Sequence, residues 1–229
     1  MIPQELKCII DLTIGDGYIN KKGTGGRIEH SVKQKEYAQH KEQLLKSLNI
    51  SLQSREYTVQ NGNNAGKSYY QINIHKNPYL LTARKWLYNK NRKALDKALF
   101  RQLDEKSLAY WFMDDGSAKL VKYNQKGSIR YIYTTPKIGA FKFSNQSFTY
   151  EENMLMVHWL WEKFQIKARI TNNNGYEVFI SDQQNKEKFL SVIQPFIHPS
   201  LFYKIQYPLN FEGIEYSIVQ RDRLSGVNP

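Results

Sequence analysis

Two stretches of the chain carry nearly the same pattern and decide its fold. Residues 9–17 read IIDLTIGDG, and residues 108–116 read LAYWFMDDG. Each is an apolar run of helical length that ends in an acidic residue and a glycine, and glycine there can adopt the left-handed conformation that closes a helix. Asp16 and Asp115 would then lie at helix C-termini, where the helix dipole disfavours negative charge. A cation between the two ends would offset that cost, so the pair predicts a divalent-metal site built from two repeats.

The segments that follow each motif repeat one order of elements, which indicates internal duplication. After the first motif, alternation and turn residues predict a hairpin, a helix, two more strands and a helix, at 18–20 with 27–33, 37–48, 52–59 with 69–75, and 79–88. After the second, the same order is expected at 128–133 with 141–144, 150–164, 167–171 with 176–181, and 186–197. Asn- and Gly-rich turns at 61–66 and 172–175 favour hairpins, and the extra length of the second copy is expected within 119–140.

Composition indicates a polyanionic partner. The chain has 33 Lys and Arg residues against 21 Asp and Glu, a formal net charge of +12. Such a balance favours nucleic acid, while a surface tuned for solubility is the alternative. No apolar stretch approaches the roughly 18 residues of a membrane span, and no secretory signal pattern is present, so no membrane partner is expected.

Strand alternation gives each predicted sheet a polar outer face. Arg, Gln and Asn can make bidentate contacts with base edges in the DNA major groove, and lysines can contact phosphates. In the first half the predicted DNA-contacting residues are Lys21, Lys22, Arg27, Glu29, Ser31, Lys33, Arg55, Gln71, Asn73 and His75. In the second half they are Lys119, Lys122, Arg130, Lys142, Gln146, Lys167, Arg169 and Thr171. Many solvated strand faces carry such residues and bind nothing, so this alternative stays open for each residue.

Other chemistries find little support. The five histidines lack metal-ligand spacing, and a single cysteine, Cys8, leaves no zinc site. The glycines at 23–26 lack the Lys-Ser/Thr ending of a phosphate-binding loop and are expected to form a hairpin turn. His158 stands among aromatic residues and is expected to pack on its helix.

The paired motifs resemble those of the LAGLIDADG homing endonucleases, in the single-chain form that carries two motifs. The second motif is the closer match. Residues 107–116, 145–149 and 199–204 also resemble free-standing, intron-encoded members. Asp11 and Tyr110 stand where the family usually has a small residue that permits close helix packing.

The resemblance implies an α+β fold of two pseudo-symmetric αββαββα repeats, residues 1–104 and 105–229. Each repeat would have a saddle-shaped antiparallel sheet that lies in the major groove, and the motif helices would pack together in a monomer with internal pseudo-twofold symmetry. Family members cut both strands of double-stranded DNA with Mg²⁺ and leave short 3′ overhangs. Two or more divalent ions between the motif carboxylates are therefore expected.

Carried over by position, Asp16 and Asp115 would be catalytic metal ligands, helped by the carbonyls of Gly15 and Asp114. The Asp114 side chain itself is expected to be solvated or to cap a helix. The family also has one lysine near the active site in each half, and Lys93 and Lys204 match best. Arg92 is the alternative to Lys93, and an ordinary surface lysine is the alternative for both.

These features favour a site-specific DNA endonuclease. The main alternative is a maturase that binds its own intron RNA, with or without DNA cleavage, and a basic structural DNA-binding protein is a third. An intracellular location is expected: a mitochondrion or chloroplast if the gene is organellar, and otherwise a bacterial or phage-infected cytoplasm.

Overall fold

The structure, a computed structural model, describes residues 2–121, 137–172 and 174–206. The first half follows the predicted order of elements, with modest shifts of their ends. Its elements are α1 (Gln4–Thr13), β1 (Tyr18–Ile19), β2 (Gly26–Ser31), α2 (Lys35–Ser47), β3 (Leu52–Thr58), β4 (Ser68–Ile74) and α3 (Pro78–Leu87). A short ladder of β5 (Tyr88–Asn89) and β6 (Arg92–Lys93) and a one-turn helix α4 (Lys97–Phe100) then lead to the second half.

The second half repeats that order. Its elements are α5 (Glu105–Asp115), β7 (Gly116–Val121), β8 (Lys137–Phe143), α6 (Tyr150–Phe164), β9 (Arg169–Asn172), β10 (Tyr176–Ile180) and α7 (Gln183–Ile193). Helix α6 has the predicted bounds because Thr149 and Glu152 form a capping box at its start. The expected strand at 128–133 lies outside the described residues, and so does most of the segment expected to carry the insertion.

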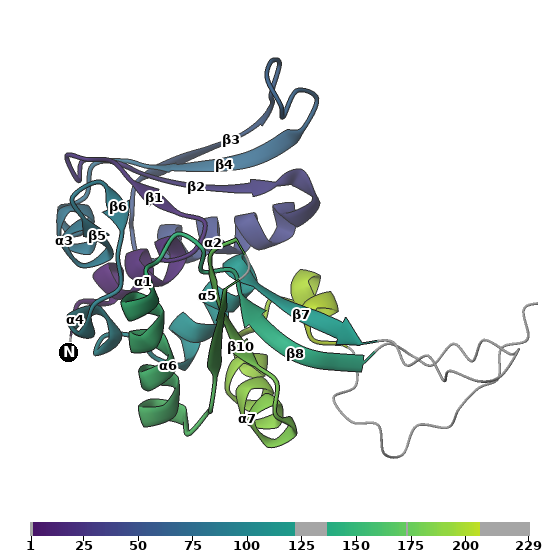
Figure 1. The fold of residues 1–229 in the computed structure, drawn as a ribbon. Coiled ribbons are helices and arrows are strands. Elements are labelled where there is room, and N and C mark those ends of the chain that lie inside the picture. The colour runs from purple at the N-terminus through teal and green to yellow at the C-terminus, as the bar shows by residue number, and fades with distance from the viewer. Residues whose placement is uncertain (1, 122–136, 173, 207–229) are drawn as a thin grey trace, which may run out of the picture.

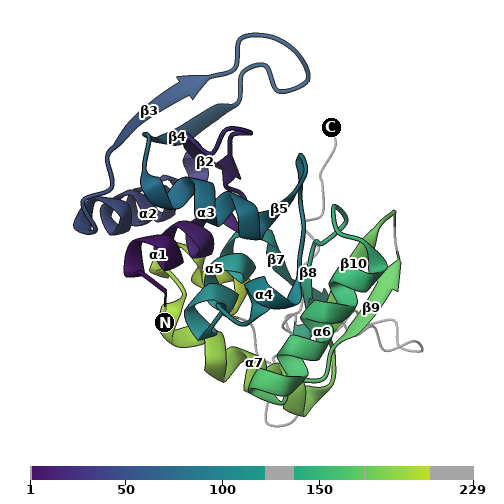
Figure 2. The same cartoon turned by 90° about the vertical axis from the view of Figure 1, so that its left-hand side faces the viewer.

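Each half builds one four-stranded antiparallel sheet with the same strand order. The orders are β1-β2-β4-β3 and β7-β8-β10-β9, so the α+β architecture with two αββαββα units is confirmed. The boundary between residues 104 and 105 stays a prediction. In Figure 1 the first sheet curves across the top with α2 beneath it, and α1 and α5 lie between the two sheets. Figure 2 shows α6 in front of β9 and β10 in the second half.

Helices α1 and α5 pack against each other at the centre of a continuous apolar core. A partly buried polar cluster joins the two helices. Lys7 Nζ donates to Asp11 Oδ1 at 2.7 Å, to Ser107 Oγ at 2.7 Å and to Asp104 Oδ1 at 3.0 Å, and Ser107 Oγ donates to Asp11 Oδ1 at 2.7 Å. Asp11 is thus buried at the helix interface because lysine and hydroxyl donors satisfy its carboxylate.

The two motif glycines do not close their helices in the left-handed conformation, so that expectation was wrong. Gly116 has φ −89° and ψ 155°, and Gly17 is not among the residues with positive φ. Close packing is the reason for glycine here. A Cβ at Gly17 would lie closer than 3.0 Å to Thr13, and one at Gly116 would lie closer than 3.0 Å to Phe112.

Several element ends differ from the sequence prediction for local reasons. Strand β2 ends at Ser31 because its side chain accepts from the Lys33 N–H and starts a 3-10 turn. Helix α7 begins earlier than predicted because Asp182 caps it, and its last residue precedes a 3-10 turn that contains Pro195. The one-turn helix α4 and the β5–β6 ladder were not predicted. No helix in the described ranges has the length and apolar character of a membrane span.

Candidate active site

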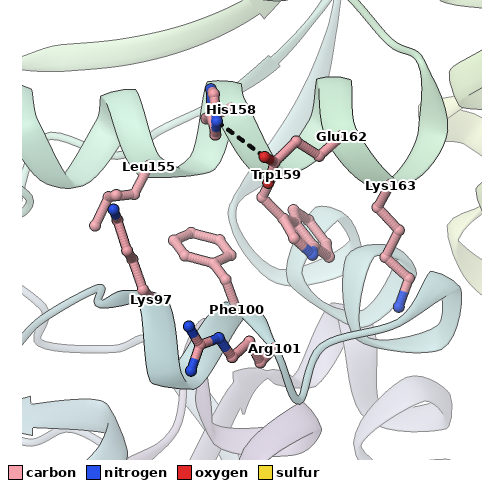
Figure 3. A pocket seen from close by; sticks show the side chains of 8 residues that line it. All are labelled: Lys97, Phe100, Arg101, Leu155, His158, Trp159, Glu162 and Lys163. Carbon is pink, nitrogen blue, oxygen red and sulfur yellow. Dashed lines mark ion pairs between the residues drawn. The ribbon is translucent and has the colours of Figure 1, made fainter.

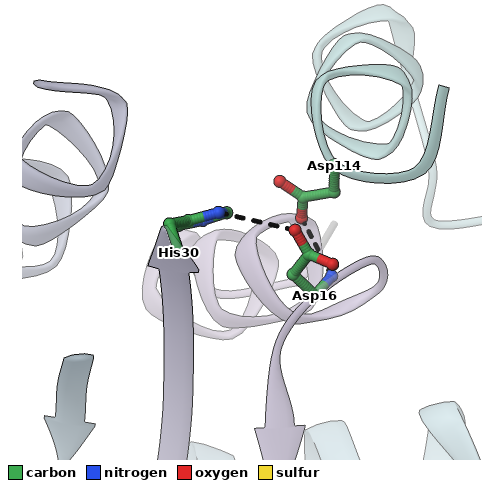
Figure 4. A group of neighbouring side chains, drawn as sticks. All are labelled: Asp16, His30 and Asp114. Atoms are coloured by element: carbon green, nitrogen blue, oxygen red, sulfur yellow. Dashed lines mark hydrogen bonds and ion pairs between the residues drawn. The ribbon is translucent and has the colours of Figure 1, made fainter. Parts of the chain in front are cut away.

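Three carboxylates meet where α1 and α5 end. Asp16 follows the end of α1, and Asp114 and Asp115 form the last turn of α5. The Asp16 N–H donates to Asp114 Oδ2 at 3.2 Å, which joins the two motif ends directly (Figure 4). The sequence prediction that the two Asp-Gly ends lie side by side is therefore met by the geometry.

The expectation for the Asp114 side chain was wrong. It is fully buried, with 0% exposure, and pairs with an equally buried Lys41 at 2.7 Å. The Tyr37 hydroxyl also donates to Asp114 Oδ1, at 3.0 Å. Burial alone would raise the pKa of Asp114, but Lys41 and the other groups around the carboxylate, among them His30 and the Asp16 N–H, together hold that pKa below its ordinary value. Asp114 points toward the first motif. Its carboxylate therefore contacts Tyr37 and Lys41 of α2 and is closed off from solvent.

The other two carboxylates have raised pKa values. Burial, and then the charges of Asp114 and Asp16, raise the pKa of Asp115 to about 7. Burial, followed by the charge of Asp114, also raises the pKa of Asp16. Like charges in a partly desolvated site favour protonation or a bound cation, so this carboxylate centre has the character of a metal site.

Each motif end is also held by one of the two predicted lysines. Lys93 Nζ donates to the carbonyls of Ile14, at 3.1 Å, and of Gly15. Lys204 Nζ donates to the carbonyls of Met113 at 2.6 Å and Gly116 at 2.9 Å. These ammonium groups face the negative ends of the two helix dipoles.

Burial lowers the pKa of Lys93 to about 8 and lowers that of Lys204 as well. Arg92 instead pairs with Glu152 at 2.8 Å, so it is Lys93 that reaches the first motif. The backbone carbonyl of Gly15, a predicted metal ligand, accepts from Lys93 in this structure.

Sequence reasoning missed His30, Tyr37 and Lys41. His30 lies on β2 with only 3% of its surface exposed, and its Nδ1 is 3.4 Å from Asp16 Oδ2. Burial, and then the charge of Lys41, lowers the pKa of His30 to about 3. The signals were present: His30 alternates with the outward residues of its strand, and Lys41 lies four residues after Tyr37 on the apolar face of its helix.

The centre is close to electrically balanced. Lys41, Lys93 and Lys204 all act on the three carboxylates. One ligand atom each from Asp16, His30 and Asp114 lie within 4.8 Å of one another. Among the described residues, this is the group of His, Cys, Asp and Glu side chains with metal-site spacing.

The outer face of the first sheet brings together five of the ten predicted DNA-contacting residues of the first half. In the strand register, Arg27 lies opposite Asn73 and Glu29 lies opposite Gln71. On its other side, Gln71 lies opposite Arg55. These side chains bond to one another: Arg55 Nε donates to Gln71 Oε1 at 3.0 Å and Gln71 Nε2 to Glu29 Oε2 at 2.9 Å. Gln71 is consequently only 4% exposed.

The remaining first-half residues lie off that ladder. Ser31 is the last residue of β2, and Lys33 lies in the 3-10 turn after it rather than on the strand. Lys21 and Lys22 are exposed in the turn after β1, and His75 is exposed just beyond β4.

The second sheet carries a similar but less complete face. Lys142 on β8 pairs with Glu177 at 2.7 Å, and Gln146, in the following loop, also contacts Glu177 at 3.3 Å. The other described residues of the set are Lys119 on β7, Arg169 and Thr171 on β9, and Lys167 just before that strand. Lys122 and Arg130 lie outside the described residues.

A separate pocket lies between α4 and α6, and none of the residues of the carboxylate centre lines it (Figure 3). Three cationic side chains and two aromatic rings contribute to its wall: Lys97, Arg101 and Lys163, with Phe100 and Trp159. His158 borders this pocket and pairs with Glu162 at 3.0 Å. Its side chain is 68% exposed, so the expectation that His158 packs on its helix was wrong.

Comparison with solved structures shows which proteins share this fold. The homing endonuclease I-WcaI bound to its DNA recognition sequence aligns with a TM-score of 0.71 and 21% identity, over 91% of this chain and 89% of that chain. I-SmaMI bound to cleaved DNA aligns with a TM-score of 0.52 and 9% identity, over 87% of this chain and 86% of that chain. At such identities the likeness establishes the fold.

Sequence comparison gives curated relatives and a family. The intron-encoded endonuclease ai4 of Dictyostelium discoideum is 29% identical over 126 residues, 52% of this chain and 65% of that protein. The cytochrome b mRNA maturase bI2 of Saccharomyces cerevisiae is 28% identical over 118 residues, 50% of this chain and 24% of that protein. Each match therefore spans less than two thirds of the relative. The model of the LAGLIDADG DNA endonuclease family matches residues 7–189, and the chain belongs to that family.

Proposed function

We propose that the protein is a monomeric, site-specific DNA endonuclease of the homing type, with residues 1–104 and 105–229 as its two repeats. The observation that carries this proposal is the meeting of two motif ends, where Asp16 bonds to Asp114 and each end is held by its own lysine. A centre with one carboxylate and one lysine from each repeat suits a duplex, whose two strands each present one phosphodiester. The double-strand cut would leave short 3′ overhangs.

The residues of the centre fit a divalent cation. Carboxylate oxygens are the ligands that Mg²⁺ prefers, and burial together with the charge of Asp114 raises the pKa values of Asp16 and Asp115, which a bound cation would lower again. Asp16 and Asp115 would hold Mg²⁺, with the carbonyls of Gly15 and Asp114 as further ligands and two or more ions in all. When bound, the cation supplies charge stabilisation at phosphate oxygens and activates water.

The chain's own side chains would position the phosphates and offset their charge. Lys93 and Lys204 lie at the two motif ends, where their ammonium groups favour the extra negative charge of a phosphoryl transition state. The outer faces of the two sheets would follow the major groove on either side, with Arg27, Arg55 and Asn73 able to contact base edges in the first half. The protein would work inside the cell, in the organelle or bacterial or phage-infected cytoplasm that holds its target.

The direct test uses a duplex made from the uninterrupted sequence that flanks the gene's intron. The wild-type protein with Mg²⁺ should cut both strands. Asp16→Asn and Asp115→Asn should each abolish the double-strand cut and change the Kd for the duplex by less than about threefold, because these carboxylates serve the cation rather than the groove. Glu162→Gln, on the exposed face of α6, is the matched control and should cut normally. Full cleavage by both Asp variants would refute the proposal.

A second candidate function is that of a maturase that binds intron RNA. The likeness to the yeast maturase bI2 favours it, and so does the pocket between α4 and α6, whose Lys97, Arg101 and Lys163 lie apart from the carboxylate centre. Splicing of the intron in vitro that depends on the protein would support this function. If splicing occurs while the uninterrupted duplex stays intact, the protein acts as a maturase and the proposed nuclease function is wrong.

A further inference from the structure

His30 is a buried histidine whose ring lacks an ordinary partner. Both ring nitrogens are buried, and within the described part of the chain neither has a partner at full hydrogen-bond geometry, although the Gln34 side chain lies near the ring. Buried polar atoms in native proteins are usually hydrogen-bonded, and an exception asks for an explanation such as a role in binding an ion. His30 therefore has a capacity to bind that the folded chain alone does not use.

The imidazole is aimed at the carboxylate centre. Figure 4 shows the His30 ring and the Asp114 carboxylate both directed toward Asp16. Nδ1 of His30 is 3.4 Å from Asp16 Oδ2, and one ligand atom from each of the three residues lies within 4.8 Å of the others. Metal–nitrogen and metal–oxygen bonds of about 2.0–2.2 Å allow three atoms at such spacing to surround one ion after small side-chain movements.

We propose that Asp16, His30 and Asp114 form a mixed nitrogen–oxygen site for a divalent first-row transition-metal ion. Its imidazole ligand would make the chain bind Mn²⁺ or Co²⁺ more tightly than Mg²⁺, since nitrogen donors suit transition metals whereas Mg²⁺ prefers oxygen. The inference deepens the proposed function, on which it rests, because it assigns a ligand and a metal preference to one part of the same centre.

The ion pair with Lys41 leaves Asp114 able to take part. A carboxylate has about four lone-pair positions on its two oxygens. Oδ1 accepts from Tyr37 and Lys41, while Oδ2 accepts from Lys41 and from the Asp16 N–H at 3.2 Å. One lone pair of Oδ2 can turn to an ion if the longest of these bonds loosens. The nearby lysines repel the ion, so a DNA phosphate in the centre would strengthen its binding.

Nitrogen ligation is expected in one half of the molecule only. In the second half, Gly116 lies opposite Phe143 in the strand register. In the first half, Tyr18 lies opposite Arg27, so one step back along the antiparallel pair places Gly17 opposite residue 28. By this count the position that matches His30 is Asn145. An amide offers an oxygen but no imidazole nitrogen, so one nitrogen-bound ion per chain is predicted.

The experiment measures metal binding on the full chain without DNA. Mn²⁺ is titrated by electron paramagnetic resonance, and electron spin-echo modulation detects a directly bonded ¹⁴N nucleus. Wild-type protein should show ¹⁴N modulation for one ion per chain. Labelling the histidines with ¹⁵N should replace the ¹⁴N modulation with that of ¹⁵N. His30→Gln should lose the modulation and weaken Mn²⁺ binding at least tenfold, while Mg²⁺ binding, measured by competition, changes less than threefold. His158→Gln, which removes the exposed histidine–glutamate pair on α6, is the matched control and should change neither.

Two outcomes would overturn the inference: no nitrogen modulation in wild-type protein, or modulation that persists in a folded His30→Gln chain. The labelled wild-type measurement keeps the test valid if that variant fails to fold, and His30→Asn provides a second replacement with its fold checked by circular dichroism. Failure of the proposed function is distinguishable. A chain that binds Mn²⁺ through His30 but cuts no duplex contradicts the nuclease alone, whereas a chain that cuts DNA without nitrogen coupling contradicts this site alone.

Discussion

Asp114 and Asp115 are adjacent in sequence but occupy opposite electrostatic environments. Asp114 accepts from Lys41 and Tyr37 and has a lowered pKa, whereas burial and neighbouring carboxylates raise the pKa of Asp115 to about 7. A helix rotates by about 100° per residue, so neighbours on α5 face different partners. The division suggests that Asp114 supports the structure of the centre more than Asp115 does.

The Lys41–Asp114 pair gives the first prediction. Lys41→Met should lower the free energy of unfolding by about 3–5 kcal/mol, because it leaves a buried carboxylate without its cation. Urea denaturation followed by circular dichroism measures the change. The double variant Lys41→Met/Asp114→Leu should recover much of the loss, since apolar pairs of similar volume often replace buried ion pairs without cost. A single-variant loss below about 1 kcal/mol would show that the pair is better solvated than its burial implies.

Asp11 gives a prediction about pH. Burial raises its pKa from 3.8 to about 6, so between these values the folded chain holds a proton that the unfolded chain has released. The free energy of unfolding should therefore fall as pH rises from about 4 to about 6, by about 3 kcal/mol from this residue. Asp11→Asn removes that contribution. The difference in the free energy of unfolding between wild type and variant, measured by urea titration at each pH, separates the contribution of Asp11 from that of the other carboxylates. A difference that does not change with pH would contradict the prediction.

At the scale of elements, each motif helix has its own lysine at its C-terminal end. If each end serves one DNA strand, Lys93→Met and Lys204→Met should each slow the cutting of a single strand, by on the order of 10²–10³-fold. Nicked circles should then accumulate from a supercoiled plasmid that carries the target, and strand-specific end labels should show opposite strands nicked by the two variants. Lys188→Met on α7 is the control. Equal slowing of both strands by each variant would mean that the lysines act on a shared step.

Some elements could be predicted from sequence and others could not, for identifiable reasons. Helix α6 was predicted at its observed bounds, and in the structure Thr149 and Glu152 form a capping box at its start. The β5–β6 ladder was missed because two-residue strands leave no periodicity to detect. Alternation predicted the outward strand faces, and the register of the structure places Arg27 opposite Asn73, but alternation could not show that Gln71 is buried by its own neighbours.

The candidate site was predictable to the extent that a motif specified it. Asp16 and Asp115 follow from their motifs, and Lys93 and Lys204 from family resemblance, and the structure brings all four to one centre. Lys41 and His30 come from α2 and β2, and only tertiary packing places them against Asp114 and Asp16. A polar residue within an apolar stripe was the available signal, and it does not say which partner the residue will meet.

At the scale of the whole molecule, the net charge of +12 gives a prediction about salt. A protein that neutralises six to ten phosphates loses about 10³–10⁵ in DNA affinity between 50 and 200 mM salt, and a loss in that range is expected here. Lys119→Gln, on the exposed side of β7, should reduce the slope of log K against log salt by about one. Lys188→Gln should leave the slope unchanged. A flat salt response would mean that the basic surface does not meet the DNA backbone.

The polar cluster at the α1–α5 interface has a consequence for building chimeric nucleases. Lys7, Asp11 and Asp104 belong to the first repeat, residues 1–104, while Ser107 belongs to the second. A hybrid that joins the first repeat to a foreign second repeat would lose the Ser107 hydroxyl, which accepts from Lys7 and donates to Asp11, and each lost bond adds to the cost. Grafting Ser107 into the foreign repeat, so that all four side chains stay together, rather than matching apolar surfaces alone, is thus the condition for recombining this chain's halves with those of its relatives.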